Sequence, residues 1–84
     1  MNDRKYIIVK EQGCELAILF HEVISHDKFL KVYDKDSIVS AGFFQVDIKD
    51  EELSVLAFGE STTLKKKSRK EDAIYIERVL KSRW

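Results

Sequence analysis

The side chains best suited to chemistry form a basic run in the last third of the chain. Five positive charges and one hydroxyl occupy six consecutive positions: Lys65, Lys66, Lys67, Ser68, Arg69 and Lys70. A helix is predicted to begin within this run, and the free backbone N–H groups at a helix N-terminus attract anions. Together with clustered Lys and Arg side chains, they predict a site for the phosphate of a nucleotide or a nucleic acid.

Two other interpretations of this basic run stay open. It is also consistent with a solvated loop whose charges aid solubility, or with a contact for the acidic patch of a protein partner. The chain has 15 basic and 15 acidic residues, so its net charge is zero. A neutral total removes the simplest argument for nucleic acid, which is a strongly basic domain.

A second charged block has the opposite sign. Between residues 47 and 60 it holds five acids against Lys49 alone: Asp47, Asp50, Glu51, Glu52 and Glu60. The chain is therefore neutral in total but bipolar along its sequence. Such blocks can pair between two copies of a chain, head to tail or across a two-fold axis. The alternative is that each block is an ordinary exposed turn or loop.

Catalytic and metal-binding patterns are weak. Cys14 has no nucleophile motif around it, and an isolated Cys is more often a small core residue. His21 and His26 are five residues apart, one more than the zinc-binding H-E-x-x-H helix requires. The sequence therefore predicts a non-enzymatic protein with no catalytic residue, no metal site and no cofactor.

Composition indicates a small cytoplasmic domain. The chain has 84 residues, 44% of them apolar, which argues against extended disorder, and its single cysteine excludes a disulfide scaffold. The longest apolar run, residues 16–20, is far shorter than the roughly 20 residues of a membrane span. The charged start leads into no secretory segment. We expect no contact with a membrane and a location in the reducing cytoplasm.

Six predicted elements position these groups, in the order strand, strand, short helix, strand, strand, long helix. A turn at Gly13 joins the first strand pair, and the polar residues 49–52 join the second. Ser68 and Glu71 have the spacing of a capping box, so the last helix is expected to start near Arg69. The expected bounds are residues 6–9, 14–20, 26–33, 38–48, 53–58 and 69–82.

The order ββαββα predicts an α+β fold in one domain, residues 1–84. We expect an antiparallel four-stranded sheet, with a short helix and a long C-terminal helix packed on one face. So small a sheet leaves its other face partly apolar, and Phe43 marks the expected patch for a partner. Trp84 is a second expected contact, because a Trp at a chain end is costly to leave in water.

Three short motifs lie in the second half of the chain. They are Ser40-Ala41-Gly42-Phe43, Gly59-Glu60-Ser61-Thr62-Thr63-Leu64 and Ser68-Arg69-Lys70-Glu71-Asp72-Ala73. Together they resemble a family of short, uncharacterised bacterial and phage-borne proteins. The resemblance implies an accessory protein of a phage or mobile element, and it brings no catalytic or binding residue with it.

The leading hypothesis is therefore a non-enzymatic cytoplasmic interaction module that associates with itself, most simply as a homodimer, and binds a protein partner. The alternative is phosphate or nucleic-acid binding through residues 65–70 and the helix N-terminus.

Overall fold

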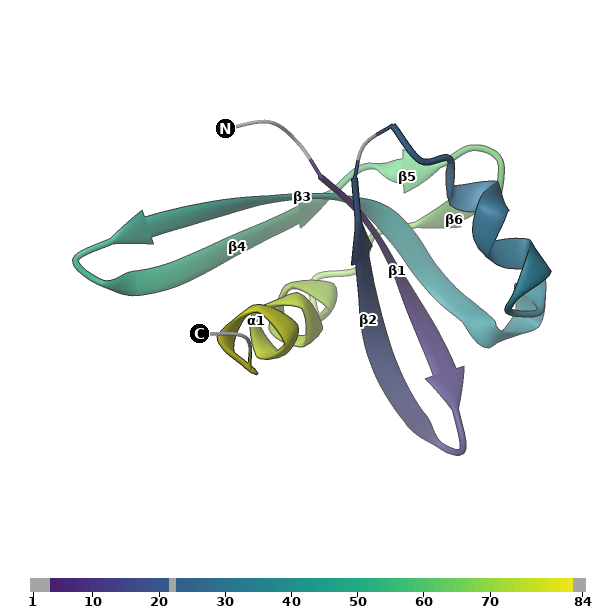
Figure 1. The fold of residues 1–84 in the computed structure, drawn as a ribbon, viewed down its shortest axis with the longest axis horizontal. Coiled ribbons are helices and arrows are strands. Elements are labelled where there is room, and N and C mark those ends of the chain that lie inside the picture. Colours follow the sequence, from purple (N-terminus) through teal and green to yellow (C-terminus); the bar gives the residue numbers. More distant parts are fainter. Residues whose placement is uncertain (1–3, 22, 83–84) are drawn as a thin grey trace.

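The computed structural model describes residues 4–21 and 23–82 and confirms an α+β fold with a four-stranded antiparallel sheet (Figure 1). The strands are β1 (Arg4–Glu11), β2 (Cys14–Phe20), β3 (Ile38–Lys49) and β4 (Glu52–Phe58). Their order across the sheet is β2-β1-β3-β4, so each hairpin contributes one edge strand.

The predicted order ββαββα and the pair of α-helices are wrong. Residues 26–31 form a 3-10 helix, η1 (His26–Lys31), and a second one follows, η2 (Lys35–Ser37). A small second sheet of β5 (Glu60–Ser61) and β6 (Lys66–Lys67) precedes the helix α1 (Asp72–Ser82). Residues 4–21 and 23–82 thus contain six strands and one α-helix.

The prediction that both helical segments pack on one face is also wrong. Tyr6 of β1 lies in a core cluster with Ile76 of α1. The next residue, Ile7, lies in a second cluster with Phe29 of η1 and with Leu64, which lies between β5 and β6. Because neighbouring residues of a strand point to opposite faces, α1 covers one face of the sheet, and η1 with the β5–β6 hairpin covers the other.

Strand β3 pairs with β1 along its first half and with β4 along its second half, and it thereby connects the β1–β2 hairpin to the β3–β4 hairpin. Residues 38–44 pair with β1 and residues 43–49 pair with β4. Beyond this overlap, residues 45–56 form a two-stranded arm that ends in a turn at Asp50 and Glu51, both with positive φ. Helix α1 contacts β2 and β4 and lies between the two diverging hairpins (Figure 1). One face of the arm is thereby supported.

A glycine is required where β3 changes partner. A Cβ atom at Gly42 would lie 2.6 Å from the backbone oxygen of Phe58 and 3.3 Å from the Cβ of Ser68. The carbonyl belongs to β4 and has little freedom to move, so we expect Gly42→Ala to lower the free energy of unfolding by about 2–3 kcal/mol. Urea unfolding followed by far-UV circular dichroism measures this loss.

Gly13 provides the control for this substitution. It has φ +80°, and nothing lies within 4 Å of an added Cβ. Gly13→Ala therefore carries only the backbone penalty of the left-handed region, about 1 kcal/mol. Equal losses for the two variants would contradict the argument that Gly42 is needed for a close approach between strands.

Candidate functional site

The basic run predicted from the sequence is divided between two structural roles. The lysines of its first half lie in the β5–β6 hairpin, where Lys66 pairs with Ser61 and Lys67 pairs with Glu60. Lys65 is in the turn with φ 56°. Lys65, Lys67 and Lys70 are exposed and Lys66 is half-buried. These four lysines remain available for an anion or an acidic partner.

Arg69 is instead engaged within the protein. Its guanidinium donates to Glu15 of β2 through an Nη at 2.6 Å, and to Asp72 through Nε at 2.9 Å. Ser68 donates its backbone N–H to the carbonyl of Gly59 at 3.0 Å. The geometry therefore separates Arg69 and Ser68 from the lysines with which they form one run in the sequence.

The carboxylate of Asp72, the first residue of α1, accepts a backbone N–H from just before the helix. The backbone N–H of Arg69 donates to Asp72 Oδ2 at 2.9 Å, and the backbone N–H of Asp72 donates to the Arg69 carbonyl at 3.1 Å. The first bond is one half of a capping box, with the acid three residues after the cap position; the second is a backbone turn bond, because Arg69 has no acceptor side chain. The predicted Ser68–Glu71 box is wrong by one residue, and the helix begins at Asp72.

Asp72 is the centre of a buried polar network. Its side chain has no exposed surface, and it accepts hydrogen bonds from the Tyr6 hydroxyl at 2.6 Å and the Ser40 hydroxyl at 2.9 Å. We call these two residues, Asp72, Arg69 and Glu15 the Asp72 network. It connects α1 to three strands, and no buried side-chain N or O atom of the described residues lacks a hydrogen-bond partner.

The network shifts the ionisation of its members. Burial, and then the hydrogen bond to Asp72, raise the pKa of the Tyr6 phenol well above its ordinary range. Burial opposes the Arg69 charge, but hydrogen bonds to Glu15 and Asp72 outweigh it and raise the Arg69 pKa. The hydrogen bond from Arg69 lowers the pKa of Glu15. All three shifts favour the protonation states that hold the network together at neutral pH.

The pH dependence of stability in the variant Glu15→Gln tests the ion pair between Glu15 and Arg69. Because the folded pKa of Glu15 is below its ordinary value of 4.5, the carboxylate stabilises the fold above that pH, and the contribution is lost as pH falls through the folded pKa. We expect wild type to exceed Glu15→Gln by roughly 1 kcal/mol at neutral pH, and the difference to shrink below about pH 4.5. Urea unfolding at a series of pH values measures it, and a gap that widens in acid would contradict it.

Phe43 lies within a row of rings, in a half-buried position. Its ring stacks on Phe58 with centroids 6.0 Å apart and meets the edge of His26 at 5.8 Å. The Lys5 ammonium lies 6.0 Å from the Phe43 centroid. Trp84, the other expected contact, lies outside the described residues. Large apolar side chains that are exposed lie elsewhere: Leu16, Val23, Ile24, Leu30, Val32, Ile48, Leu56 and Ile74.

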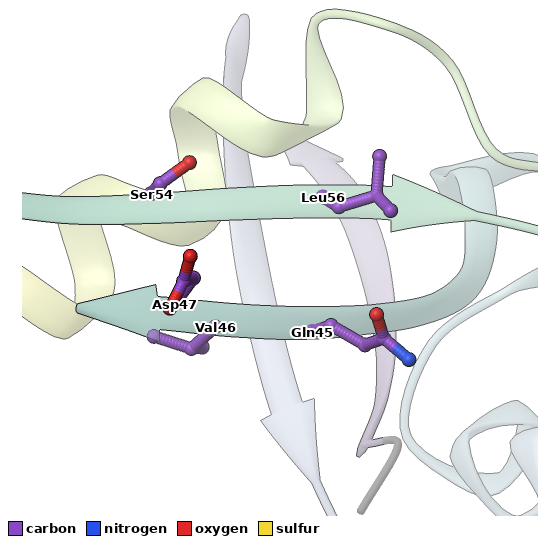
Figure 2. Close-up of a pocket in the computed structure, with 5 residues that line it drawn as sticks. All are labelled: Gln45, Val46, Asp47, Ser54 and Leu56. Carbon is purple, nitrogen blue, oxygen red and sulfur yellow. The ribbon is translucent and has the colours of Figure 1, made fainter. Parts of the chain in front are cut away.

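The arm leaves its second face uncovered. Gln45 and Asp47 of β3 lie opposite Leu56 and Ser54 of β4, and these side chains with Val46 line an open hollow of about 570 Å³ (Figure 2). Leu56 is 59% exposed there. An isolated two-stranded ribbon is marginally stable in water, so the support from α1 on one face leaves the arm able to gain from a further contact.

Four of the five acids of the acidic block lie far from the basic run, whereas the fifth, Glu60, lies in β5 opposite Lys67. The acidic tip, which we define as Asp47, Asp50, Glu51 and Glu52, is at the end of the arm. The basic hairpin, defined as Lys65, Lys66 and Lys67 with β5 and β6, lies beyond the other end of β4 (Figure 1). The molecule measures 39 Å along its longest axis, so the acidic tip and basic hairpin are available to another molecule rather than to each other.

Within residues 4–21 and 23–82, no three His, Cys, Asp or Glu side chains are grouped so that they could hold a metal ion. Cys14 is exposed at the start of β2, while His26 is buried and its Nε2 bonds to the Gly42 carbonyl at 3.0 Å. In the described part of the chain no helix has the length and apolar character to span a membrane.

Sequence reasoning did not find Asp72. Its partners Tyr6 and Ser40 are 66 and 32 residues away in the sequence. The only local signal is an acid in the first turn of a helix, which many helices share. Comparison with protein-family models, with curated proteins and with solved structures gives no match for this chain.

Proposed function

We propose that this protein is a non-enzymatic interaction module that associates with a second copy of itself and acts as a homodimer in the cytoplasm. The observation that carries the proposal is the arm. It ends in the acidic tip, has α1 on one face only, and has an edge strand along its length. A further copy of the chain offers both the strand and the opposite charge that this arm lacks.

A non-enzymatic role is supported by how the reactive side chains are used. Arg69 and Asp72, the ionic groups with the most defined geometry, form hydrogen bonds that join α1 to the sheet. Asp72 has no exposed surface on which a substrate can act. The Asp72 network therefore fits a structural role. The resemblance of three motifs to phage-borne proteins supports an accessory role in a phage or mobile element.

Sedimentation velocity across low to high micromolar concentration tests the self-association. We expect the weight-average sedimentation coefficient to rise with concentration from the monomer value to that of a dimer. A strict monomer throughout this range would overturn the proposal.

The basic hairpin supports a second candidate function, which is phosphate or nucleic-acid binding. The candidate site is reduced to Lys65, Lys66, Lys67 and Lys70, since Arg69 is already engaged with Glu15 and the N–H groups of Asp72 and Ile74 donate to backbone carbonyls. Fluorescence anisotropy with a labelled DNA duplex at low salt tests it. Binding through these lysines would weaken with salt, with a log–log slope of about −0.9 per phosphate contacted. The absence of binding at low salt would exclude this candidate.

A further inference from the structure

We infer that the second copy docks along the free edge of β4, antiparallel to it, with Val55 on the two-fold axis. The two sheets then form one continuous sheet across the dimer. This inference rests on the proposed self-association and names the surface that mediates it.

Within the described residues, the outer edge of β4 has no pairing strand. β4 has β3 on one side and no strand on the other within the four-stranded sheet. In a two-residue hairpin the flanking pair, here Lys49 and Glu52, exchanges both backbone hydrogen bonds. Along an antiparallel strand, successive residues direct their backbone groups toward and away from the paired strand in turn. The N–H and C=O groups of Leu53, Val55 and Ala57 therefore point away from β3, toward the free edge.

Natural sheet edges are commonly protected by Lys, Pro or a bulge. β4 has the sequence ELSVLAF, with neither Lys nor Pro, and it pairs with β3 in an unbroken register. A regular edge of this kind is the template that another strand requires. The pattern therefore favours β-strand pairing over a contact made by side chains alone.

The register follows from symmetry. Two identical antiparallel strands are related by a two-fold axis that passes through the middle of their paired residues. Val55 is the middle residue of β4, so only an axis at Val55 pairs all seven residues of β4 with β4 of the second copy. In this register Ser54 faces Leu56 of the second copy. Ser54 and Leu56 both lie on the uncovered face of the arm (Figure 2). In the dimer, the hollows of the two copies would then be neighbours.

Charge selects the antiparallel direction. With Glu52 opposite Phe58 of the second copy, the acidic tip extends past the end of that copy's β4. There, Gly59 joins β4 to the β5–β6 hairpin, in which Lys65, Lys66 and Lys67 outnumber the one acid, Glu60. Each copy contributes one tip and one hairpin, so the attraction occurs twice. Parallel pairing would place the two acidic tips side by side, where like charges repel.

The other edge strand, β2, lacks this complementarity. The residues around its hairpin turn carry both signs, with Lys10 and Glu11 before the turn and Glu15 after it. Glu15 is also already paired with Arg69. Pairing along β2 therefore brings no block of one charge to a block of the other.

Cross-linking between two different variants tests the register. Both carry Cys14→Ser; one adds Ser54→Cys and the other adds Leu56→Cys with a mass tag. Directly opposite residues of an antiparallel pair have Cα atoms about 4.5–5.5 Å apart, within the roughly 4.4–6.8 Å that a disulfide needs. Under mild oxidation, we expect a disulfide dimer of mixed mass in the mixture and none in either variant alone.

The outcomes separate this inference from the proposed function. A dimer by sedimentation without the mixed disulfide would overturn the β4 docking and leave self-association standing. A disulfide in either variant alone would indicate another register and also overturn it. A strict monomer by sedimentation would remove the proposed function itself.

Charge reversal tests the contact between tip and hairpin. One variant carries Glu51→Lys and Glu52→Lys, and the other carries Lys66→Glu and Lys67→Glu. Counting Lys49, the first variant's tip changes from −3 to +1, and the second variant's run Lys65–Lys67 changes from +3 to −1. Each variant alone should dimerise about ten-fold or more weakly at low salt, because its tip and its lysine run then have the same sign. In the mixed dimer each tip meets a lysine run of opposite sign, so the affinity should recover toward that of wild type. Weakening without recovery in the mixture would contradict the contact.

Discussion

Asp72→Ala is expected to lower the free energy of unfolding by about 3–5 kcal/mol. Four donors lose their acceptor together: the hydroxyls of Tyr6 and Ser40, and the backbone N–H and the side-chain Nε of Arg69. Tyr6 and Ser40 have no exposed surface, so water cannot replace the lost carboxylate without opening the core. Urea unfolding at a fixed protein concentration measures the loss, since self-association adds a concentration-dependent term.

Asp72→Asn and Glu71→Ala complete the test. Asn keeps the shape and one acceptor oxygen but directs an NH₂ group at donors, so we expect an intermediate loss of about 1–3 kcal/mol. Glu71 is exposed and lies 3.6 Å from the Arg69 Nε, so its removal should change stability by less than about 1 kcal/mol. If Asp72→Ala unfolds at the same urea concentration as Glu71→Ala, the Asp72 network does not stabilise the fold.

The four main strands were predictable because their signals are local. Residues 6–9 and 16–20 are continuously apolar and lie on either side of a turn with Gly13, and β1 and β2 include these positions. The alternation of Phe44 and Val46 with Gln45 and Asp47 places one set toward α1 and the other on the uncovered face, as the pattern predicts. Hydrophobic period and turn chemistry are sufficient for such elements.

The connecting segments were not predictable in the same way. Phe29 and Val32 are three residues apart, a spacing that suits a 3-10 helix as well as an α-helix. The six residues of η1 complete about two turns of either kind, too few for a helical period to distinguish them. β5 and β6 have two residues each and no apolar alternation. The buried Leu64 and the Ser61 hydroxyl, which accepts the Leu64 N–H at 3.3 Å, position this hairpin.

In the candidate site, too, some features follow from local sequence and others depend on distant residues. The exposed lysines could be identified from charge alone, because a run of like charges stays in solvent wherever the chain places it. Arg69 could not be separated from them, since its role depends on Glu15, 54 residues earlier in the sequence. Long-range partners therefore decide which charges of a run are free and which are structural.

Ile76→Ala should lower the free energy of unfolding by about 2–5 kcal/mol. Ile76 is the one apolar side chain of α1 with no exposed surface, and it lies in the cluster with Tyr6, Ile8 and Phe44. Truncation leaves a cavity at the point where the helix meets the sheet. Ile74, on the same helix, is 54% exposed and provides the matched control. Ile74→Ala should change stability by less than about 0.5 kcal/mol, because Ala is also the better helix former.

The two variants also separate the fold from the assembly. Helix α1 supports one face of the arm through its contacts with β4, so a loosened helix should increase hydrogen exchange in β4 and weaken dimerisation. We expect both effects for Ile76→Ala, measured by exchange mass spectrometry and sedimentation at a concentration where wild type is dimeric. Ile74→Ala should show neither. If Ile76→Ala lowers stability but dimerises like wild type, the docking surface does not depend on the helix, and the arm must be held by β3 alone.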